Sequence, residues 1–148
     1  MNGEKRIMNR AIKGLPRKPQ DYIAYLVLKE DHIPRYGVYL IQNNLKGDNE
    51  VKEWTVSLKV RSEDELLSQA MMDILLRLPK GTSLQIVTAI KSLGSILYGK
   101  RKIKGCEDRW EKVDALLKER DLYLHISKES QHNVFSTHLA KLLEEKVS

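Results

Sequence analysis

The sequence predicts an α/β domain in which a mixed five-stranded sheet is covered by helices. The run YIAYLVL, residues 22–28, is nearly all apolar and has the length of a strand buried on both faces. Residues 51–60, VKEWTVSLKV, alternate apolar and polar side chains, as a half-buried strand does. Residues 62–78 then place apolar side chains at helical spacing. The sequence therefore contains both strands and helices, as an α/β domain requires.

The first three strands are predicted to form an antiparallel meander. The strand over 22–28 is followed by YGVYLIQN, residues 36–43, which is again mostly apolar. A polar turn, LKGDN at 45–49, separates it from the alternating strand over 51–60. Short connections of this kind join neighbouring antiparallel strands.

The second half of the chain alternates helices with strands. Ser62 and Glu65 have the spacing of a capping box at the start of a helix, and Pro79 with Gly81 ends it. A strand, helix, strand connection forces parallel pairing and is right-handed in almost all proteins. The remaining predicted elements are a strand over 83–90, a short helix within 91–100, a helix over 108–121 on Trp110, Val113, Leu116 and Leu117, a strand over 122–127 and a helix over 134–146.

Length and composition fit one intracellular domain. The 148 residues can bury one sizeable core. No apolar run reaches the roughly 18 residues of a transmembrane helix, and the N-terminus lacks the apolar stretch of a secretory signal. Cys106 is the single cysteine, which excludes an internal disulfide and a thiolate zinc site. We therefore expect an intracellular protein, without a distinction between cytoplasm and nucleus.

Positive charge is concentrated in two parts of a chain whose net charge is +6. Residues 1–20 are rich in cations and poor in apolar periodicity, so we predict a basic N-terminal extension before a domain over residues 21–148. Basic clusters raise the affinity for phosphate backbones through counterion release. An exposed tail and a solubilising loop would have the same composition. The second cluster consists of Lys91, Lys100, Arg101, Lys102 and Lys104.

The order and the lengths of these elements resemble the ribonuclease H fold. Four segments are similar to family motifs in the expected order: PRYGVYL at 34–40, IVTAIKSLGSIL at 86–97, WEKVDALLKERDLYLHISK at 110–128 and NVFSTHLAKLL at 133–143. The resemblance covers about residues 22–143. It implies the strand order 3-2-1-4-5, with helices flanking the sheet.

The same resemblance implies that the family's catalytic carboxylates are replaced in this chain. Active members bring four carboxylates onto two divalent metal ions, and magnesium requires such oxygen ligands. The resemblance places the four positions at Leu28, Leu67, Ala89 and Thr137, and the loop histidine near Ser130. We therefore expect no metal site, no cofactor and no catalytic residues. A relocated metal site stays open as a less favoured reading, using acids among Glu30, Asp31, Asp64, Glu65, Asp73 and Glu129.

Three histidines lie close together in the sequence, at His125, His132 and His138. Their spacings of seven and six residues match no short zinc-binding motif, and zinc needs at least three converging ligands. A catalytic pair between a histidine and Cys106 is supported only by a lone cysteine near a basic loop. We interpret this stretch as a strand, a loop and the start of a helix.

The leading functional hypothesis is a catalytically inactive ribonuclease H-like domain that binds nucleic acid, a duplex or an RNA/DNA hybrid, by its backbone. The resemblance implies phosphate contacts from a basic protrusion between the fourth strand and the long helix. A protein-interaction or scaffold domain, or a homodimer, using the former substrate face is the alternative, and a nuclease with a relocated metal site is the third. No membrane contact is expected. The residues predicted to bind nucleic acid are Lys100, Arg101, Lys102 and Lys104.

Overall fold

The computed structural model describes residues 11–13, 19–43, 49–97, 103, 105–128 and 134–145. Within these ranges the strands form one sheet of six in the order β1-β6-β5-β2-β3-β4. The strands are β1 (Ala11–Lys13), β2 (Tyr22–Lys29), β3 (Arg35–Gln42), β4 (Glu50–Ser57), β5 (Ser83–Thr88) and β6 (Tyr123–Lys128). The helices are α1 (Glu63–Leu76), α2 (Lys91–Leu97), α3 (Glu107–Glu119) and α4 (Val134–Glu145).

The sheet confirms the predicted strand order. The five predicted strands are β2, β3, β4, β5 and β6 in chain order, so the observed arrangement β4-β3-β2-β5-β6 is the order 3-2-1-4-5. The strands β2, β3 and β4 pair antiparallel, whereas β5 is parallel to β2 and to β6. The short β1 is an addition that lies within the predicted N-terminal extension. It pairs parallel with β6, with Ala11 opposite Leu124.

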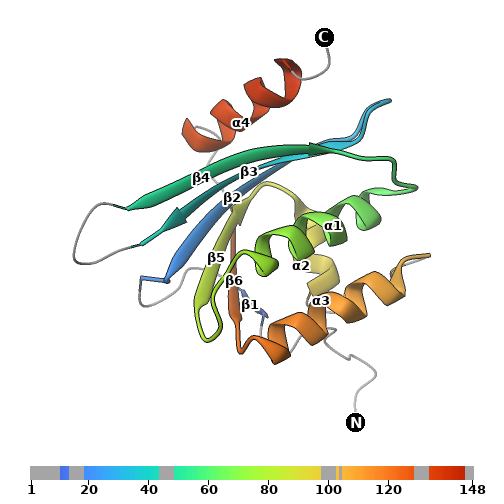
Figure 1. The fold of residues 1–148 in the computed structure, drawn as a ribbon. Helices are drawn as coiled ribbons and strands as arrows, with labels where there is room; N and C mark the ends of the chain where they lie inside the picture. Colours follow the sequence, from blue (N-terminus) through green and yellow to red (C-terminus); the bar gives the residue numbers. More distant parts are fainter. Residues whose placement is uncertain are drawn as a thin grey trace.

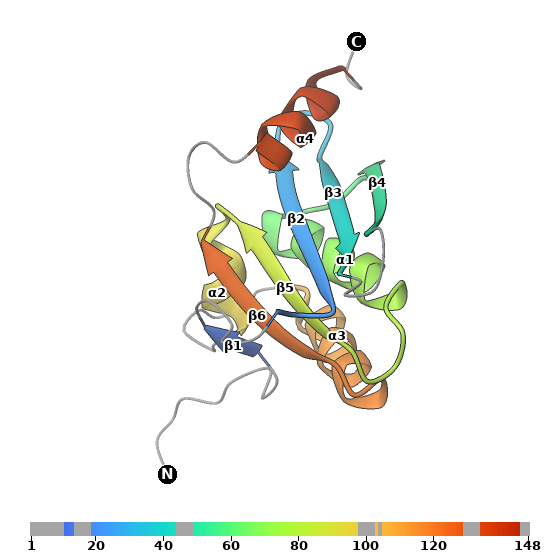
Figure 2. The ribbon, with the colours of Figure 1, turned by 90° about the vertical axis from the view of Figure 1, so that its left-hand side faces the viewer.

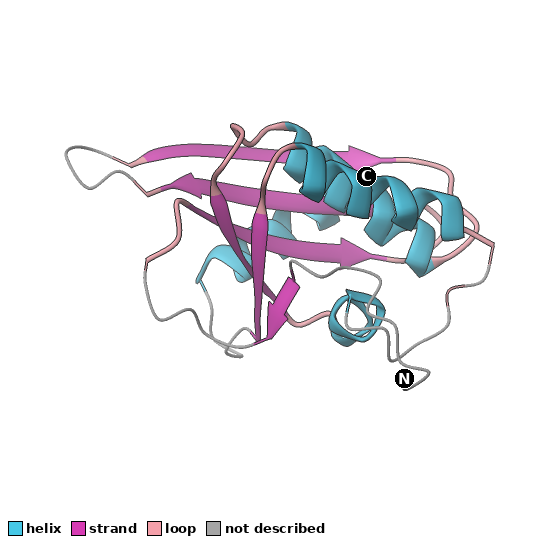
Figure 3. Ribbon diagram, turned by 90° about the horizontal axis from the view of Figure 1, so that it is seen from below, coloured by secondary structure: helices cyan, strands magenta, loops and turns pink. Residues whose placement is uncertain are grey.

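The helices cover the two faces of the sheet unequally. Figure 1 shows α1, α2 and α3 on one face and α4 alone on the other. Viewed from the α4 side, this helix lies over β2 and β3 and leaves the β5 and β6 side uncovered by any described helix (Figure 2). Seen from below, the helices of the α1, α2 and α3 layer lie in front of the long strands of the sheet (Figure 3). The main core therefore lies between the sheet and the helices α1, α2 and α3.

Alternation along the strands decides which side chains enter this core. Ala24, Leu26, Val38 and Leu40 point to the same face and are at most 3% exposed. The predicted helical stripe of α1 packs against them, and so does Trp110 of α3. The buried side chains of that stripe are Leu66, Leu67, Ala70, Met71, Ile74, Leu75 and Leu78.

Two local side-chain bonds set element boundaries. The N-cap bond of the predicted capping box is present, because the Ser62 hydroxyl accepts a hydrogen bond from the Glu65 amide at 3.2 Å, while the Glu65 carboxylate accepts from the Arg61 amide. The strand predicted over 83–90 ends earlier, at Thr88. There the Thr88 hydroxyl accepts from the Ile90 amide at 3.2 Å, which replaces a ladder bond and turns the chain toward α2.

Aromatic stacking and a close backbone approach hold α4 on its face of the sheet. The ring of Phe135 lies 4.7 Å from the rings of both Tyr25 and Tyr39, measured between centroids. Gly37 lets the helix come close, since a β-carbon there would lie 3.2 Å from a methyl group of Leu139. α4 is therefore fixed by packing at its start and at its middle.

Polar contacts fix the far end of α4. The buried Arg35 donates from Nε to the Leu143 carbonyl at 2.8 Å, and Lys29 pairs with Glu144 at 2.6 Å. A cation at a helix C-terminus also interacts favourably with the helix dipole. Within the described ranges, no helix is long and apolar enough to cross a membrane.

Candidate functional site

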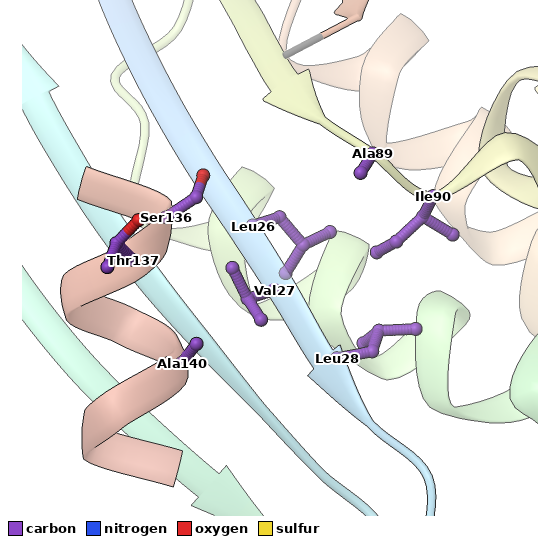
Figure 4. Close-up of a pocket in the computed structure, with 8 residues that line it drawn as sticks. All are labelled: Leu26, Val27, Leu28, Ala89, Ile90, Ser136, Thr137 and Ala140. Atoms are coloured by element: carbon purple, nitrogen blue, oxygen red, sulfur yellow. The ribbon is translucent and has the colours of Figure 1, made fainter. Parts of the chain in front are cut away.

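A groove of about 330 Å³ lies where β2 and β5 end beside α4. In Figure 4, Thr137 and Ala140 of α4 line one side, Ala89 and Ile90 the other, and β2 runs between them. Because β2 and β5 are parallel, their carboxyl ends meet at one edge of the sheet, which is where α/β sheets commonly bind ligands. The lining residues are Leu26, Val27, Leu28, Ala89, Ile90, Ser136, Thr137 and Ala140.

The floor of the groove is set by the end of β5. Thr88 is buried and donates from its hydroxyl to the Leu26 carbonyl at 2.9 Å, which ties β5 to β2. The chain turns at once, so that Ala89 is exposed at the edge of the groove. The lining is apolar except for the hydroxyl groups of Ser136 and Thr137. The groove thus offers a surface for apolar groups and few ligands for a hard cation.

Three of the four positions to which the resemblance assigns a carboxylate meet in this groove. Leu28, Ala89 and Thr137 all line it. Leu67 does not, because it lies on the inward stripe of α1 and is fully buried in the core. The α1 position that the resemblance assigns therefore does not line the groove, and the α1 side chain that bonds Ser92, two residues past Ile90, is Glu63 in the first turn.

Acidic side chains gather beyond the Leu28 and Ile90 end of the groove. Glu30, two residues past Leu28, lies near Glu63 in the first turn of α1. Ser92, two residues past Ile90, donates to the same Glu63 carboxylate. Burial and the neighbouring charges of Glu63 and Asp64 raise the pKa of Glu30. This end of the groove is therefore negative.

These acids do not converge on one point. Among the residues that the structure describes, no three acidic, histidine or cysteine side chains are placed to hold a metal ion. Asp31 instead bonds the buried Arg35 at 2.7 Å, and this contact lowers the pKa of Asp31. Glu65 accepts from the Arg61 amide at 2.8 Å at the start of α1, and Glu129 lies outside the described residues.

Asp73 has a structural role on the other half of α1. Its Oδ2 accepts from the Tyr36 hydroxyl at 2.7 Å and from Trp54 Nε1 at 2.6 Å. Burial, followed by the bond to Asp73, raises the pKa of Tyr36. Arg77 bonds Asp73 at 3.2 Å and lies 3.8 Å from the centre of the Trp54 ring. The cluster joins α1 to β3 and β4.

Neither His125 nor His138 lines the groove. His125 is half-buried on the β6 face that also carries the exposed Tyr123. His138 pairs with Glu53 of β4, and its ring meets Tyr39 edge to face at 6.5 Å. His132 lies outside the described residues. Cys106 is buried, and burial raises the pKa of its thiol, which opposes formation of a nucleophilic thiolate.

The predicted nucleic-acid contacts lie outside the described residues. This holds for Lys100, Arg101, Lys102, Lys104 and for Ser130, the position assigned to the loop histidine. The nearest described member of the basic cluster is Lys91, which is exposed at the start of α2.

Sequence reasoning missed most of the groove. Ile90, Ser136 and Ala140 lie within segments similar to the family, but no functional position was assigned to them, and the contact of Glu30 with Glu63 joins positions far apart in the chain. The available signal was the parallel pairing of the first and fourth predicted strands, which brings their carboxyl ends to one edge. The strand pairing predicts where the groove lies but not which side chains line it.

The fold and the groove define an α/β protein with a groove at the edge of a mixed sheet, and structural comparison identifies the fold as that of ribonuclease H. An LC11-RNase H1 structure in complex with an RNA/DNA hybrid matches 86% of this chain and 99% of its own, at 15% identity and a TM-score of 0.58. RNase H1 from the halophilic archaeon Halobacterium salinarum NRC-1 matches 84% and 98%, at 11% identity and a TM-score of 0.61. No protein-family model and no curated protein matches the sequence.

Proposed function

We propose that this chain is a ribonuclease H-fold domain that binds nucleic acid without cleaving it. The observation that carries the loss of cleavage is the meeting of Leu28, Ala89 and Thr137 in one groove. Two-metal catalysis requires oxygen ligands at this place, and leucine and alanine side chains supply none. The hydroxyl of Thr137 alone is a poor substitute for several carboxylates.

Charge and fold support the binding half of the proposal. A net charge of +6 favours association with a polyanion, and the residues proposed to contact phosphates are Lys100, Arg101, Lys102 and Lys104. The LC11-RNase H1 structure with the same fold is a complex with an RNA/DNA hybrid. We extend that ligand class to this chain as the proposed partner, recognised through backbone shape more than sequence.

A cleavage assay tests the first half. The purified chain is incubated with an end-labelled RNA/DNA hybrid in the presence of magnesium and, separately, manganese. Intact hybrid is the expected result over hours at enzyme excess. Product that depends on the metal, and that disappears in a Glu30→Gln/Glu63→Gln double variant, would establish a relocated metal site and overturn the proposal.

A salt titration tests the second half. Four phosphate contacts give a slope of roughly −3 to −4 in log K against log salt, so affinity for the hybrid should fall by roughly 100-fold between 50 and 200 mM salt. Replacing Lys100, Arg101, Lys102 and Lys104 by serine should remove most of that slope. A charge-matched control replaces four exposed lysines elsewhere, namely Lys52, Lys59, Lys80 and Lys112. Equal losses in both variants would mean that net charge, and not the basic cluster, carries the binding.

Protein interaction through the former substrate face is the second candidate function. The apolar lining of the groove favours it, because Val27, Leu28 and Ile90 are only partly buried at an edge of the sheet. Association of the purified chain with itself or with a partner protein would then depend on these side chains.

A further inference from the structure

We propose that the groove between β2, β5 and α4 binds a short protein segment that carries an aliphatic side chain followed by lysine or arginine. The inference rests on the second candidate function, protein interaction through this face, and is independent of nucleic-acid binding by the basic cluster. It assigns the apolar part of the segment to the groove and the cation to its acidic end.

The lining fits an aliphatic side chain. Leu28, Ile90 and Ala140 present only carbon to the groove, and Val27 and Ala89 extend the same surface. A cavity of about 150 Å³ lined by such residues is large enough for benzene. The volume of about 330 Å³ therefore admits one or two aliphatic side chains together with part of their backbone. Such a ligand needs few hydrogen bonds from the walls.

The acidic end of the groove selects a cation. The Ser92 hydroxyl bonds the Glu63 carboxylate two residues past Ile90, and Glu30, two residues past Leu28, lies close enough to Glu63 and Asp64 for their negative charges to act on its carboxyl group. The neighbouring cation Lys29 is engaged with Glu144 at 2.6 Å. A lysine or arginine of the bound segment would relieve the repulsion between these carboxylates, since opposite charge favours their ionised form.

A phosphate backbone fits this place poorly. The negative charge of the phosphates would lie near Glu30 and Glu63. The apolar lining would also strip water from the phosphates without supplying hydrogen-bond donors. Nucleic acid in the groove is therefore a competing outcome of the test, and not the occupant proposed.

Peptide titration followed by amide NMR of the full chain tests the proposal. The probes are three acetylated, amidated hexapeptides with the sequences GLLKRG, GLLEEG and GSSKRG. We expect GLLKRG to shift the resonances of Leu28, Ala89, Ile90 and Ala140, and to bind at least about tenfold more tightly than the other two. No shift at these residues up to millimolar peptide, or a preference for GLLEEG, overturns the proposal.

Two pairs of variants locate the contacts. Ala140→Gln fills the groove from an exposed helical position, and Ala115→Gln is the matched control on the exposed side of α3. The first should weaken GLLKRG at least about tenfold and the second should not change it. Glu30→Gln should weaken GLLKRG but leave GLLEEG no weaker. Identical affinities for Ala140→Gln and Ala115→Gln overturn the assignment to the groove.

A competition experiment separates this inference from the proposed function. An RNA/DNA hybrid added to the complex of the chain with GLLKRG should leave the groove resonances in their bound positions. If the hybrid displaces the peptide while still showing the salt-dependent binding of the basic cluster, the groove itself binds nucleic acid. That result would overturn the peptide proposal. If the peptide does not bind, only this inference fails, because the cleavage assay and the salt titration test the proposed function separately.

Discussion

The carboxyl group of Glu30 should make the stability of the protein decrease as pH rises. Its pKa is raised in the folded state, by burial and by the charges of Glu63 and Asp64, so the folded chain holds this proton more tightly than the unfolded chain. The folded state is therefore favoured below the unfolded pKa of about 4.3, and this advantage is lost as the pH rises through the raised folded pKa.

Glu30→Gln should consequently be more stable than the wild type at pH 7 and no more stable at pH 3.5. The measurement is the urea midpoint of unfolding at both pH values. An equal difference between the two proteins at both pH values would show that Glu30 does not titrate differently on folding.

Asp31 should give a pH dependence of opposite sign. The hydrogen bond from Arg35 lowers the pKa of Asp31, so its contribution is present above the unfolded pKa and is lost as the pH falls through the folded pKa. Asp31→Asn should destabilise the protein at pH 7 and have a smaller effect at pH 3. The same urea titrations check this, and a larger effect at pH 3 than at pH 7 would contradict it.

At the scale of an element, α4 should depend on Phe135 for its docking. The ring contacts both Tyr25 and Tyr39, so Phe135→Ala removes two ring contacts between α4 and the sheet and should cost about 2–3 kcal/mol. The neighbouring Val134 is 74% exposed, and Val134→Ala should change stability by less than about 0.5 kcal/mol.

Unfolding in urea measures both variants, and hydrogen exchange of the α4 amides shows whether the loss is local. Faster exchange in α4 of Phe135→Ala, with the core of β2 still protected, is the expected pattern. Similar stabilities for Phe135→Ala and Val134→Ala would mean that the ring stacking contributes nothing.

Local patterns predicted most element positions but missed β1 and placed two strand ends too late, since the strand predicted over 51–60 ends at Ser57 and the strand predicted over 83–90 ends at Thr88. The start of α1 could be predicted from Ser62 and Glu65, because these two residues lie only three positions apart and form a local pattern. The end of β5 was missed because Thr88, Ala89 and Ile90 are all compatible with a strand. The Thr88 hydroxyl accepts from the Ile90 amide in the turn and donates to the Leu26 carbonyl, and this second partner lies on another strand.

At the scale of the whole molecule, β1 should stabilise the free edge of β6. It adds a parallel pairing of three residues, from Ala11 opposite Leu124 to Lys13 opposite Ile126. Removal of residues 1–13 should leave a folded domain with a Tm lowered by about 2–5 °C and with faster hydrogen exchange in β6. Removal of residues 1–10 is the control and should retain the β6 protection. Equal Tm values for the two truncated chains would show that β1 adds no stability.

The sequence by itself determined the types and the order of the elements, since the period of apolar residues is a local property. It also determined that Leu28, Ala89 and Thr137 carry no carboxylate. Only the tertiary structure decided that these three meet in one groove while Leu67 enters the core. It likewise decided that Glu30 meets Glu63. Strand order and helix packing join residues that are distant in the chain, and no local pattern records which side chains they bring together.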